Sequence, residues 1–185
     1  MKKFFIIAAS SILLFACSNK KSEESKTGGS DSTSKMESKT PPQSEFADAK
    51  YADMGKKMID QMSKADMDGY VSNFADNAVY AWSAGDSLAG KEAISKYWKD
   101  RRSKVIDSIS FSNDIWLPIK VNTPQKGPDM AGVWLLGWYQ VNVKYKNGKK
   151  LGFWTHVDSH FDSNDKIDRT VQYIDMAPIN KALGK

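Results

Sequence analysis

The sequence predicts an α+β fold in which helices pack on one face of a curved antiparallel sheet. Helical periodicities come first, between residues 46 and 102, and alternating strand patterns follow over residues 109–175. Asn147-Gly148 and Asn164-Asp165 are turn signals that separate successive strands, so these strands are expected to form hairpins. A run of helices followed by a run of strands is typical of an α+β domain.

Length and charge exclude several classes of protein. The chain has 185 residues, which suits one domain with flanking segments rather than two ordinary domains. Residues 47–185 hold 20 Lys and Arg and 17 Asp and Glu, a net charge of +3, without a long basic stripe. The sequence therefore predicts no nucleic-acid partner. A single cysteine excludes an internal disulfide framework and a cysteine-based zinc site.

The first 17 residues have the pattern of an export signal. A cationic start precedes the apolar run Phe4–Ala16, which is shorter than the roughly 20 residues of a membrane span. Leu14-Phe15-Ala16-Cys17 resembles the bacterial lipobox, and Cys17 is the only cysteine. We predict that residues 1–17 are a lipoprotein signal peptide and lipobox, with lipid on Cys17 anchoring the chain to the membrane of the cell envelope. Ser18 favours the outer membrane over the inner one; the alternative is an ordinary signal peptide with an incidental cysteine.

Residues 18–45 are predicted to be a disordered linker. They contain no aromatic residue and only Met36 as a large apolar one, so they cannot bury enough surface to offset the entropy of ordering. Every Trp and Tyr lies beyond this segment. Residues 46–185 are therefore predicted to form the single folded domain.

Three helices are expected in the first half of this domain. Apolar residues at helical spacing predict a helix over residues 46–63. Asp66 can cap a short helix that ends near Phe74, because its carboxylate accepts N–H groups of the first turn. A strand over residues 78–82 follows, and Gly90 precedes a helix over residues 91–102. The buried positions of the first and last of these helices are Tyr51, Met54, Met58, Ile59, Met62, Ile94, Tyr97 and Trp98.

The second half is expected to form strands over residues 109–117, 133–145, 151–161 and 167–175. Three prolines predict a loop over residues 118–128, and Gly137 is a candidate for a β-bulge.

Three segments resemble those of one known family in the same order. The segment 65–82 resembles the helix-turn-strand entry of nuclear-transport-factor-2-like (SnoaL-like) domains. Gly90-Lys-Glu-Ala-Ile94 resembles the glycine-initiated third helix of that family, and Asn164-Asp-Lys-Ile167 resembles the turn before its last strand. The resemblance covers about residues 46–183. It implies a cone in which a bent sheet wraps the first helix around a deep, mostly apolar cavity.

The resemblance leaves the activity open. The family includes ketosteroid isomerase, scytalone dehydratase, limonene epoxide hydrolase and polyketide cyclases, together with non-catalytic binding and dimerisation modules. A shared fold does not transfer a reaction. The chain has no phosphate-binding loop and no glycine-rich dinucleotide motif, so no cofactor is predicted.

One strand carries both histidines of the chain. Alternation places Trp154, His156, Asp158 and His160 on one face and more apolar residues on the other, which predicts that the histidine face points away from the core unless the bent sheet reverses it locally. His156 with Asp158 is a candidate acid–base pair, since histidine exchanges protons near neutral pH. Residues four apart on a strand are separated by about 13 Å, so the two histidines cannot share one ion and no metal is predicted.

Asp114 is a further candidate catalytic residue. Strict alternation places it on one face with Ser110, Ser112 and Trp116. A carboxylate beside an aromatic ring can have a raised pKa and act as a base. The alternative is a solvated aspartate on a strand.

Aromatic residues supply the candidate ligand contacts. Tyr80, Trp82, Trp116 and Trp138 lie in elements that enclose the cavity implied by the resemblance, and such side chains suit a flat organic ligand. We therefore predict a lipid-anchored envelope protein whose domain binds a small apolar molecule. One alternative is a cofactor-independent proton-transfer enzyme of isomerase, dehydratase or cyclase type. The other is a non-catalytic interaction module, and in each case a homodimer is expected.

Overall fold

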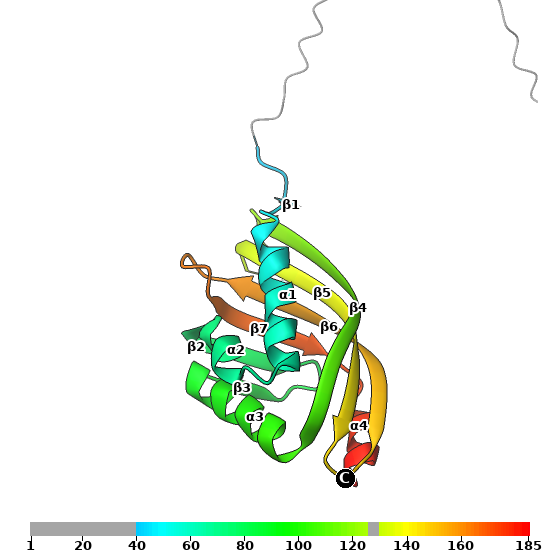
Figure 1. Cartoon of the computed structure of the whole chain (residues 1–185). Coiled ribbons are helices and arrows are strands. Elements are labelled where there is room, and N and C mark those ends of the chain that lie inside the picture. Colours follow the sequence, from blue (N-terminus) through cyan, green and yellow to red (C-terminus); the bar gives the residue numbers. More distant parts are fainter. Residues whose placement is uncertain (1–39, 126–129) are drawn as a thin grey trace, which may run out of the picture. The chain divides into compact units, whose positions relative to one another are not determined.

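A computed structural model describes residues 40–125 and 130–185 (Figure 1). The predicted signal peptide, the lipidated Cys17 and most of the predicted linker lie outside the described residues. Among the described residues, each helix is too short or too polar to span a bilayer. The helices and strands, in chain order, are β1 (Ser44–Phe46), α1 (Lys50–Ser63), α2 (Met67–Ser72), β2 (Phe74–Trp82), β3 (Ser87–Ala89), α3 (Lys91–Lys104), β4 (Ile106–Val121), β5 (Gly132–Tyr145), β6 (Lys150–Phe161), β7 (Ile167–Tyr173) and α4 (Met176–Leu183).

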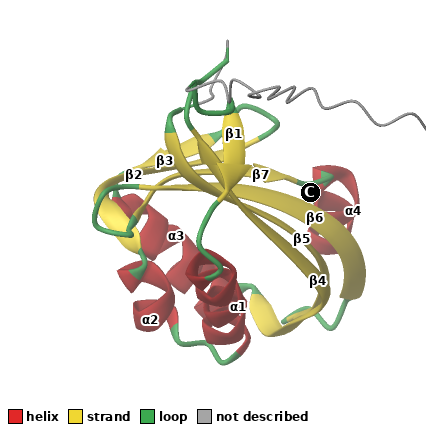
Figure 2. Cartoon of the chain, turned by 90° about the horizontal axis from the view of Figure 1, so that it is seen from above, coloured by secondary structure: helices red, strands yellow, loops and turns green. Residues whose placement is uncertain are grey.

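The strands form one curved sheet in the order β1-β4-β5-β6-β7-β2-β3. All neighbours are antiparallel except β2 and β7, which run parallel, so the sheet is mixed rather than purely antiparallel as expected. Helices α1, α2 and α3 cover one face, which we call the inner face (Figure 2). The opposite, outer face carries no helix of the described chain. The predicted α+β class is confirmed.

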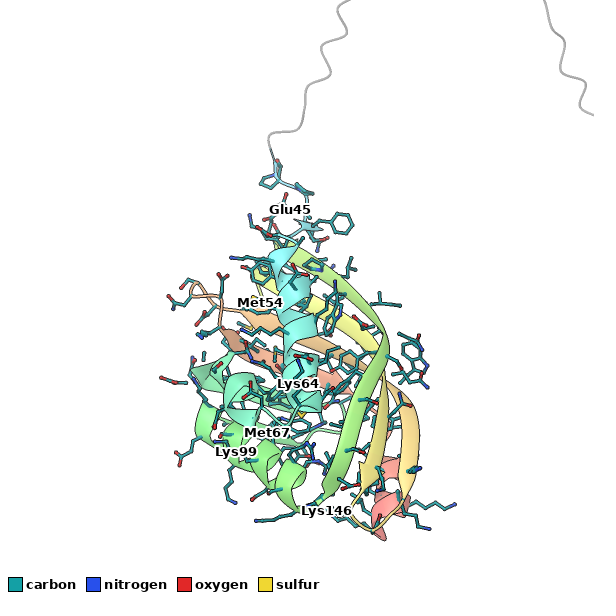
Figure 3. The ribbon with its side chains drawn as sticks, viewed as in Figure 1. Glu45, Met54, Lys64, Met67, Lys99 and Lys146 are labelled. Carbon is teal, nitrogen blue, oxygen red and sulfur yellow. The ribbon has the colours of Figure 1, made fainter. Side chains whose placement is uncertain are left out.

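The first helix begins later than predicted. Its expected start, Phe46, lies in β1, which pairs with β4, and Ser44 and Glu45 from the predicted linker belong to the same strand. The Asp48 carboxylate accepts a hydrogen bond from the Lys50 N–H at 2.8 Å, and α1 starts there. Met54 of α1 packs against the core between the helices and the sheet (Figure 3).

Two predicted helix starts are confirmed. The Asp66 carboxylate accepts from the Gly69 N–H at 2.9 Å and caps α2. Gly90 has a φ of 86° immediately before α3, a conformation that glycine adopts readily. Ile94 of α3 is fully buried, while Tyr97 and Trp98 are half-buried beside the aromatic cluster of the core.

Strand β4 is longer than predicted at both ends and contains a bulge that was not predicted. It continues through Pro118, which was expected to begin a loop. The Pro118 carbonyl accepts from the Ala47 N–H, just past the end of β1. The Pro118 nitrogen faces the same edge, where β1 has ended, so the missing N–H of proline removes no hydrogen bond between paired strands. The expected bulge at Gly137 is wrong: the register shifts on β4 between Ser112 and Ile115.

The bulge changes which residues of β4 face the helices. It inserts one extra residue, and Asn113 within it has a φ of 54°. Ile109 and Phe111, just before the bulge, face inward at odd positions, and after it the inward positions are even, as Trp116 shows. The strict alternation that placed Trp116 with Ser110 and Ser112 is therefore wrong.

The two predicted turns are confirmed, and a last helix was missed. Gly148 has a φ of 83° in the β5–β6 turn, and Asp165 has a φ of 57° in the β6–β7 turn. Helix α4 follows β7, with the Asp175 carboxylate accepting from the Ala177 N–H at 2.9 Å and Gly184 ending it in the left-handed conformation. Its buried Ile179 packs on the inner-face residues of β4 and β5.

Candidate ligand-binding cavity

A cavity of about 90 Å³ lies between α1, α3, α4 and the inner face of the sheet. Its walls are mostly apolar and aromatic. None of its lining residues is His, Asp or Glu, and Arg101 is the one charged residue among them. The lining residues are Met58, Ile59, Met62, Tyr70, Tyr80, Trp82, Tyr97, Trp98, Arg101, Ile106, Ile109, Phe111, Tyr139, Val141, Val143, Tyr145, Phe153, Gln172, Ile174, Met176 and Ile179.

Two of the predicted ligand contacts, Tyr80 and Trp82, lie in this wall. The Tyr80 hydroxyl and the Trp82 indole N–H both donate to Oε1 of Gln172, at 2.8 and 3.1 Å. The Gln172 amide in turn donates to the Thr155 hydroxyl at 3.2 Å. This buried chain of bonds links β2, β6 and β7, so both aromatic rings are held in fixed orientations.

The tyrosines of the cavity are held in their protonated form. Burial raises the pKa of Tyr70, Tyr80, Tyr97, Tyr139 and Tyr145 above the ordinary value of 10.0. For Tyr97 the neighbouring Arg101 guanidinium opposes this rise. Protonated phenols donate hydrogen bonds and are poor bases or nucleophiles at neutral pH.

Trp116 lies inside the fold but lines a smaller cavity of about 50 Å³. Its ring lies between Gly55 of α1 and Gly137 of β5, where a Cβ atom on either glycine would lie 2.6 or 2.5 Å from it. Its indole N–H donates to the exposed Asp114 carboxylate at 2.7 Å. Asp114 therefore sits at the bulge as the acceptor for this ring, and it is not among the lining residues of either cavity.

His156, Asp158 and Trp138 lie on the outer face. The His156 ring stacks between Trp138 and Tyr173, at centroid distances of 4.3 and 5.4 Å. Its Nδ1 is 3.1 Å from the Gly137 carbonyl oxygen, and its Nε2 is 2.8 Å from the Asp158 carboxylate. Burial raises the pKa of Asp158, while His156 beside it acts in the opposite direction.

The outer-face position of His156, Asp158 and Trp138 keeps all three side chains out of the cavity. The sheet separates His156 and Asp158 from the cavity, as the alternation of this strand indicated. Trp138 was expected in the ligand-binding cavity and lies instead on the outer face, since its cross-strand partner is His156. A catalytic role for His156 and Asp158 stays a prediction, and it belongs to the outer face.

The second histidine has partners of its own. Nδ1 of His160 is 2.6 Å from the Asp168 carboxylate, and Nε2 is 3.0 Å from the Ala131 carbonyl oxygen. Both partners are acceptors, so both ring nitrogens donate when the imidazole carries two protons. Within residues 40–125 and 130–185, no group of three His, Cys, Asp or Glu could hold a metal ion.

Solved structures share this architecture. An NTF2-like protein of unknown function from Burkholderia pseudomallei is 11% identical over 72% of this chain and 97% of its own, with a TM-score of 0.57. The fold is nuclear-transport-factor-2-like. A candidate polyketide cyclase from Xanthomonas campestris is 11% identical over 71% of this chain and 95% of its own, with a TM-score of 0.57.

A third similar structure contains a bound small molecule. It is a ketosteroid-isomerase-like protein from Catenulispora acidiphila in complex with trimethylamine, 10% identical over 71% of this chain and 92% of its own, with a TM-score of 0.51. No protein-family model and no curated protein matches the chain. At these identities the likeness shows the fold alone.

Sequence reasoning missed part of the wall of this NTF2-like cavity. Arg101 and Gln172 line it, although neither was a predicted contact. Arg101 lies three residues after Trp98 on α3, so helical spacing could have placed it on the same side. Gln172 gave no comparable signal, because it faces inward on a strand whose other inward residues include the polar Thr170.

Proposed function

We propose that the chain is a lipid-anchored cell-envelope protein whose NTF2-like domain binds a small, largely apolar molecule in the cavity beneath α4. The observation that carries this proposal is the composition of the wall. Apart from Arg101 and Gln172 its residues are apolar or aromatic, its tyrosines remain protonated, and it includes no His, Asp or Glu that could exchange a proton near neutral pH.

Native mass spectrometry of gently purified residues 38–185 tests this proposal. These residues form one compact unit and contain every helix and strand described above. We expect a co-purified small molecule that is lost in Trp82→Ala, which removes part of the wall. Trp138→Ala is the matched control, because Trp138 lies on the outer face. Retention in Trp82→Ala with loss in Trp138→Ala would place the ligand on the wrong face and contradict the proposal.

A proton-transfer enzyme is the second candidate function. It is favoured by the description of a similar structure as a candidate polyketide cyclase. Catalysis by His156 and Asp158 would occur on the outer face, where the two side chains are 2.8 Å apart. General acid–base catalysis contributes about 100-fold or more, so this reading expects His156→Ala to lower turnover by that factor without unfolding the protein. Binding in the cavity instead predicts unchanged ligand affinity in this variant.

A homodimer through the outer face is part of the proposal. Three rows of residues cross β4, β5, β6 and β7 in register on this face, and most of them are apolar or aromatic. Trp154 and Tyr173 are 54% and 44% exposed, and Ile115 is 58% exposed. Exposed apolar residues beside partly buried ones on one sheet face are typical of an interaction site, although Trp134 and His160 of the third row are buried. The rows are Ile115-Trp138-His156-Tyr173, Leu117-Leu136-Asp158-Val171 and Ile119-Trp134-His160-Arg169.

Anchoring through Cys17 is supported by the sequence pattern. More than one acyl chain gives durable membrane attachment, whereas one chain does not. We expect the mature chain to be recovered with the outer membrane and to incorporate a labelled fatty acid, and Cys17→Ser to abolish both. Label retained by Cys17→Ser would exclude this residue as the anchor.

A further inference from the structure

The polar groups of the cavity are mainly hydrogen-bond donors. Donors in the wall favour a ligand that carries hydrogen-bond acceptors. This inference rests on the ligand-binding function proposed above. Oε1 of Gln172 already accepts two hydrogen bonds from the wall itself. The hydroxyls of Tyr70, Tyr139 and Tyr145 have no hydrogen-bond partner among the described residues, and burial keeps them protonated. A ligand with acceptor oxygens matches this wall.

Arg101 adds a positive charge to the same wall. Its guanidinium lies 5.6 Å from the centroid of the Tyr97 ring, and the side chain is half-buried. Among the described residues it forms no ion pair with a carboxylate. The neighbouring Arg102 differs, because it donates to the carbonyl oxygens of Ile106 and Asp107 and so fastens the end of α3 to β4. Arg101 is thus the cation of α3 that has no carboxylate or carbonyl partner among the described residues, so its guanidinium can bind a ligand.

Trp98 supplies an independent observation. Its indole N–H is buried and has no acceptor among the described residues. Buried polar groups are nearly always hydrogen-bonded, so an orphaned donor indicates a missing acceptor. Trp98 lies three residues before Arg101, and side chains at this spacing share one face of a helix.

We propose that the ligand is a small organic carboxylate, with its apolar body in the cavity and its carboxylate on the Arg101 guanidinium. Arginine binds carboxylates through two parallel hydrogen bonds, which fixes both position and orientation. The cavity of about 90 Å³ is smaller than the roughly 150 Å³ that holds benzene, so the apolar body is at most one ring and the wall must move to admit it. Met58, Met62 and Met176 in the wall are flexible and allow it to adapt.

A cationic ligand is the opposite possibility that aromatic walls raise. Rings of Tyr and Trp attract ammonium groups, and one similar structure was solved with trimethylamine. In this chain, however, the Arg101 guanidinium already lies against the Tyr97 ring. A second cation in the same cavity would be repelled by it, and no carboxylate in the wall would compensate.

Three probes of one shape and different charge test the inference: benzoate, benzamide and benzamidinium. Residues 38–185 are titrated with each at low salt, and the indole N–H signals of Trp82 and Trp98 are followed by heteronuclear NMR. We expect benzoate to bind at least about tenfold more tightly than benzamide, in line with a charge-assisted bond. Arg101→Gln should remove this preference and leave benzamide binding unchanged. Lys149→Gln removes one exposed positive charge elsewhere and is the matched control.

The outcomes separate the inference from the proposed function. Binding of benzamide without a preference for benzoate, or a preference that survives Arg101→Gln, overturns the carboxylate and leaves the cavity as a binding site. Tightest binding by benzamidinium overturns it in favour of a cation. Binding of none of the three overturns both the inference and the proposed function.

Discussion

Gly137 shows how one residue can mislead a sequence prediction. A glycine in a strand suggests a bulge, but it also marks a place where another group approaches the backbone closely. Here the approaching group is the Trp116 ring, and the bulge lies across the ladder on β4. Gly55 of α1 faces the same ring, so two glycines leave the space that one indole fills.

Substituting Gly137 should therefore destabilise the fold. In Gly137→Ala the new methyl group would lie 2.5 Å from the Trp116 ring, which must move into packed surroundings. Overpacking of this kind costs about 1–3 kcal/mol of unfolding free energy. Urea unfolding measures the loss, with Gly152→Ala as control, since its nearest contact is Asn142 Oδ1 at 3.3 Å. Equal effects of the two substitutions would refute the packing account.

Asp165 links the β6–β7 turn to α1 through hydrogen bonds whose contribution to stability depends on pH. Its carboxylate accepts from Lys50 at 2.7 Å and from the Tyr51 hydroxyl at 2.6 Å, and these bonds lower its pKa below 3.8. A carboxyl group with a lowered pKa stabilises the folded state above its ordinary pKa, and this contribution disappears as the pH falls through the folded value.

The stability difference between the wild type and Asp165→Asn should therefore depend on pH. Asparagine tolerates the φ of 57° found here, so the substitution removes the charge and leaves the turn intact. We expect the wild type to be more stable at pH 6, and the difference to shrink at pH 3. Urea unfolding at both pH values measures it. A difference of the same size at both would show that the charge of Asp165 contributes nothing.

Among the helices and strands, the features predicted correctly from the sequence are those that depend on residues close together in the chain. The Asp66 cap, the Gly90 start and both hairpin turns depend on residues a few positions apart, and each is found as predicted. The start of α1, the bulge of β4 and the strand through Pro118 depend on pairing between distant segments. A single sequence contains no local signal for such pairing, which is why these features were predicted wrongly.

Helix α4 contributes to the stability of the fold, because it packs over the inner-face residues at one end of the sheet. Ile179 is 3% exposed there, beside Tyr139 and Val143. Ile179→Ala should lower the unfolding free energy by about 2–5 kcal/mol, as large-to-small substitutions in cores do. Lys181→Ala, at an exposed position of the same helix, should change it little in the same denaturation experiment. A loss below about 0.5 kcal/mol for Ile179→Ala would mean that α4 is not docked in solution.

For the molecule as a whole, the outer face is the proposed interface of a homodimer, and a charge placed on it should shift the chain towards the monomer. Tyr173→Lys places a charge at the end of the row that runs from Ile115 through Trp138 and His156. We expect it to weaken dimerisation of residues 38–185 at least tenfold in analytical ultracentrifugation. Ser110→Lys lies on β4 away from these rows and should leave association unchanged. A wild-type chain that stays monomeric at every concentration would exclude the dimer.

The candidate site was predictable only where it depends on residue type. Large aromatics on the predicted strand of residues 78–82 indicated a cavity wall, and Tyr80 and Trp82 lie in it. Trp138 was misplaced because the family resemblance gives the enclosing elements but not the face of each strand. Helical spacing could have placed Arg101 in the wall, but its lack of a carboxylate partner is visible only in the folded arrangement.

The most direct test of a binding cavity beneath α4 is a titration of residues 38–185 with benzene, followed through the tryptophan indole signals by heteronuclear NMR. The six tryptophans report on both faces of the sheet within one experiment. Binding in the cavity predicts saturable shifts of the Trp82 and Trp98 signals, with Trp138 and Trp154 unchanged. Shifts confined to Trp138 and Trp154, or no shift at saturating benzene, would contradict it.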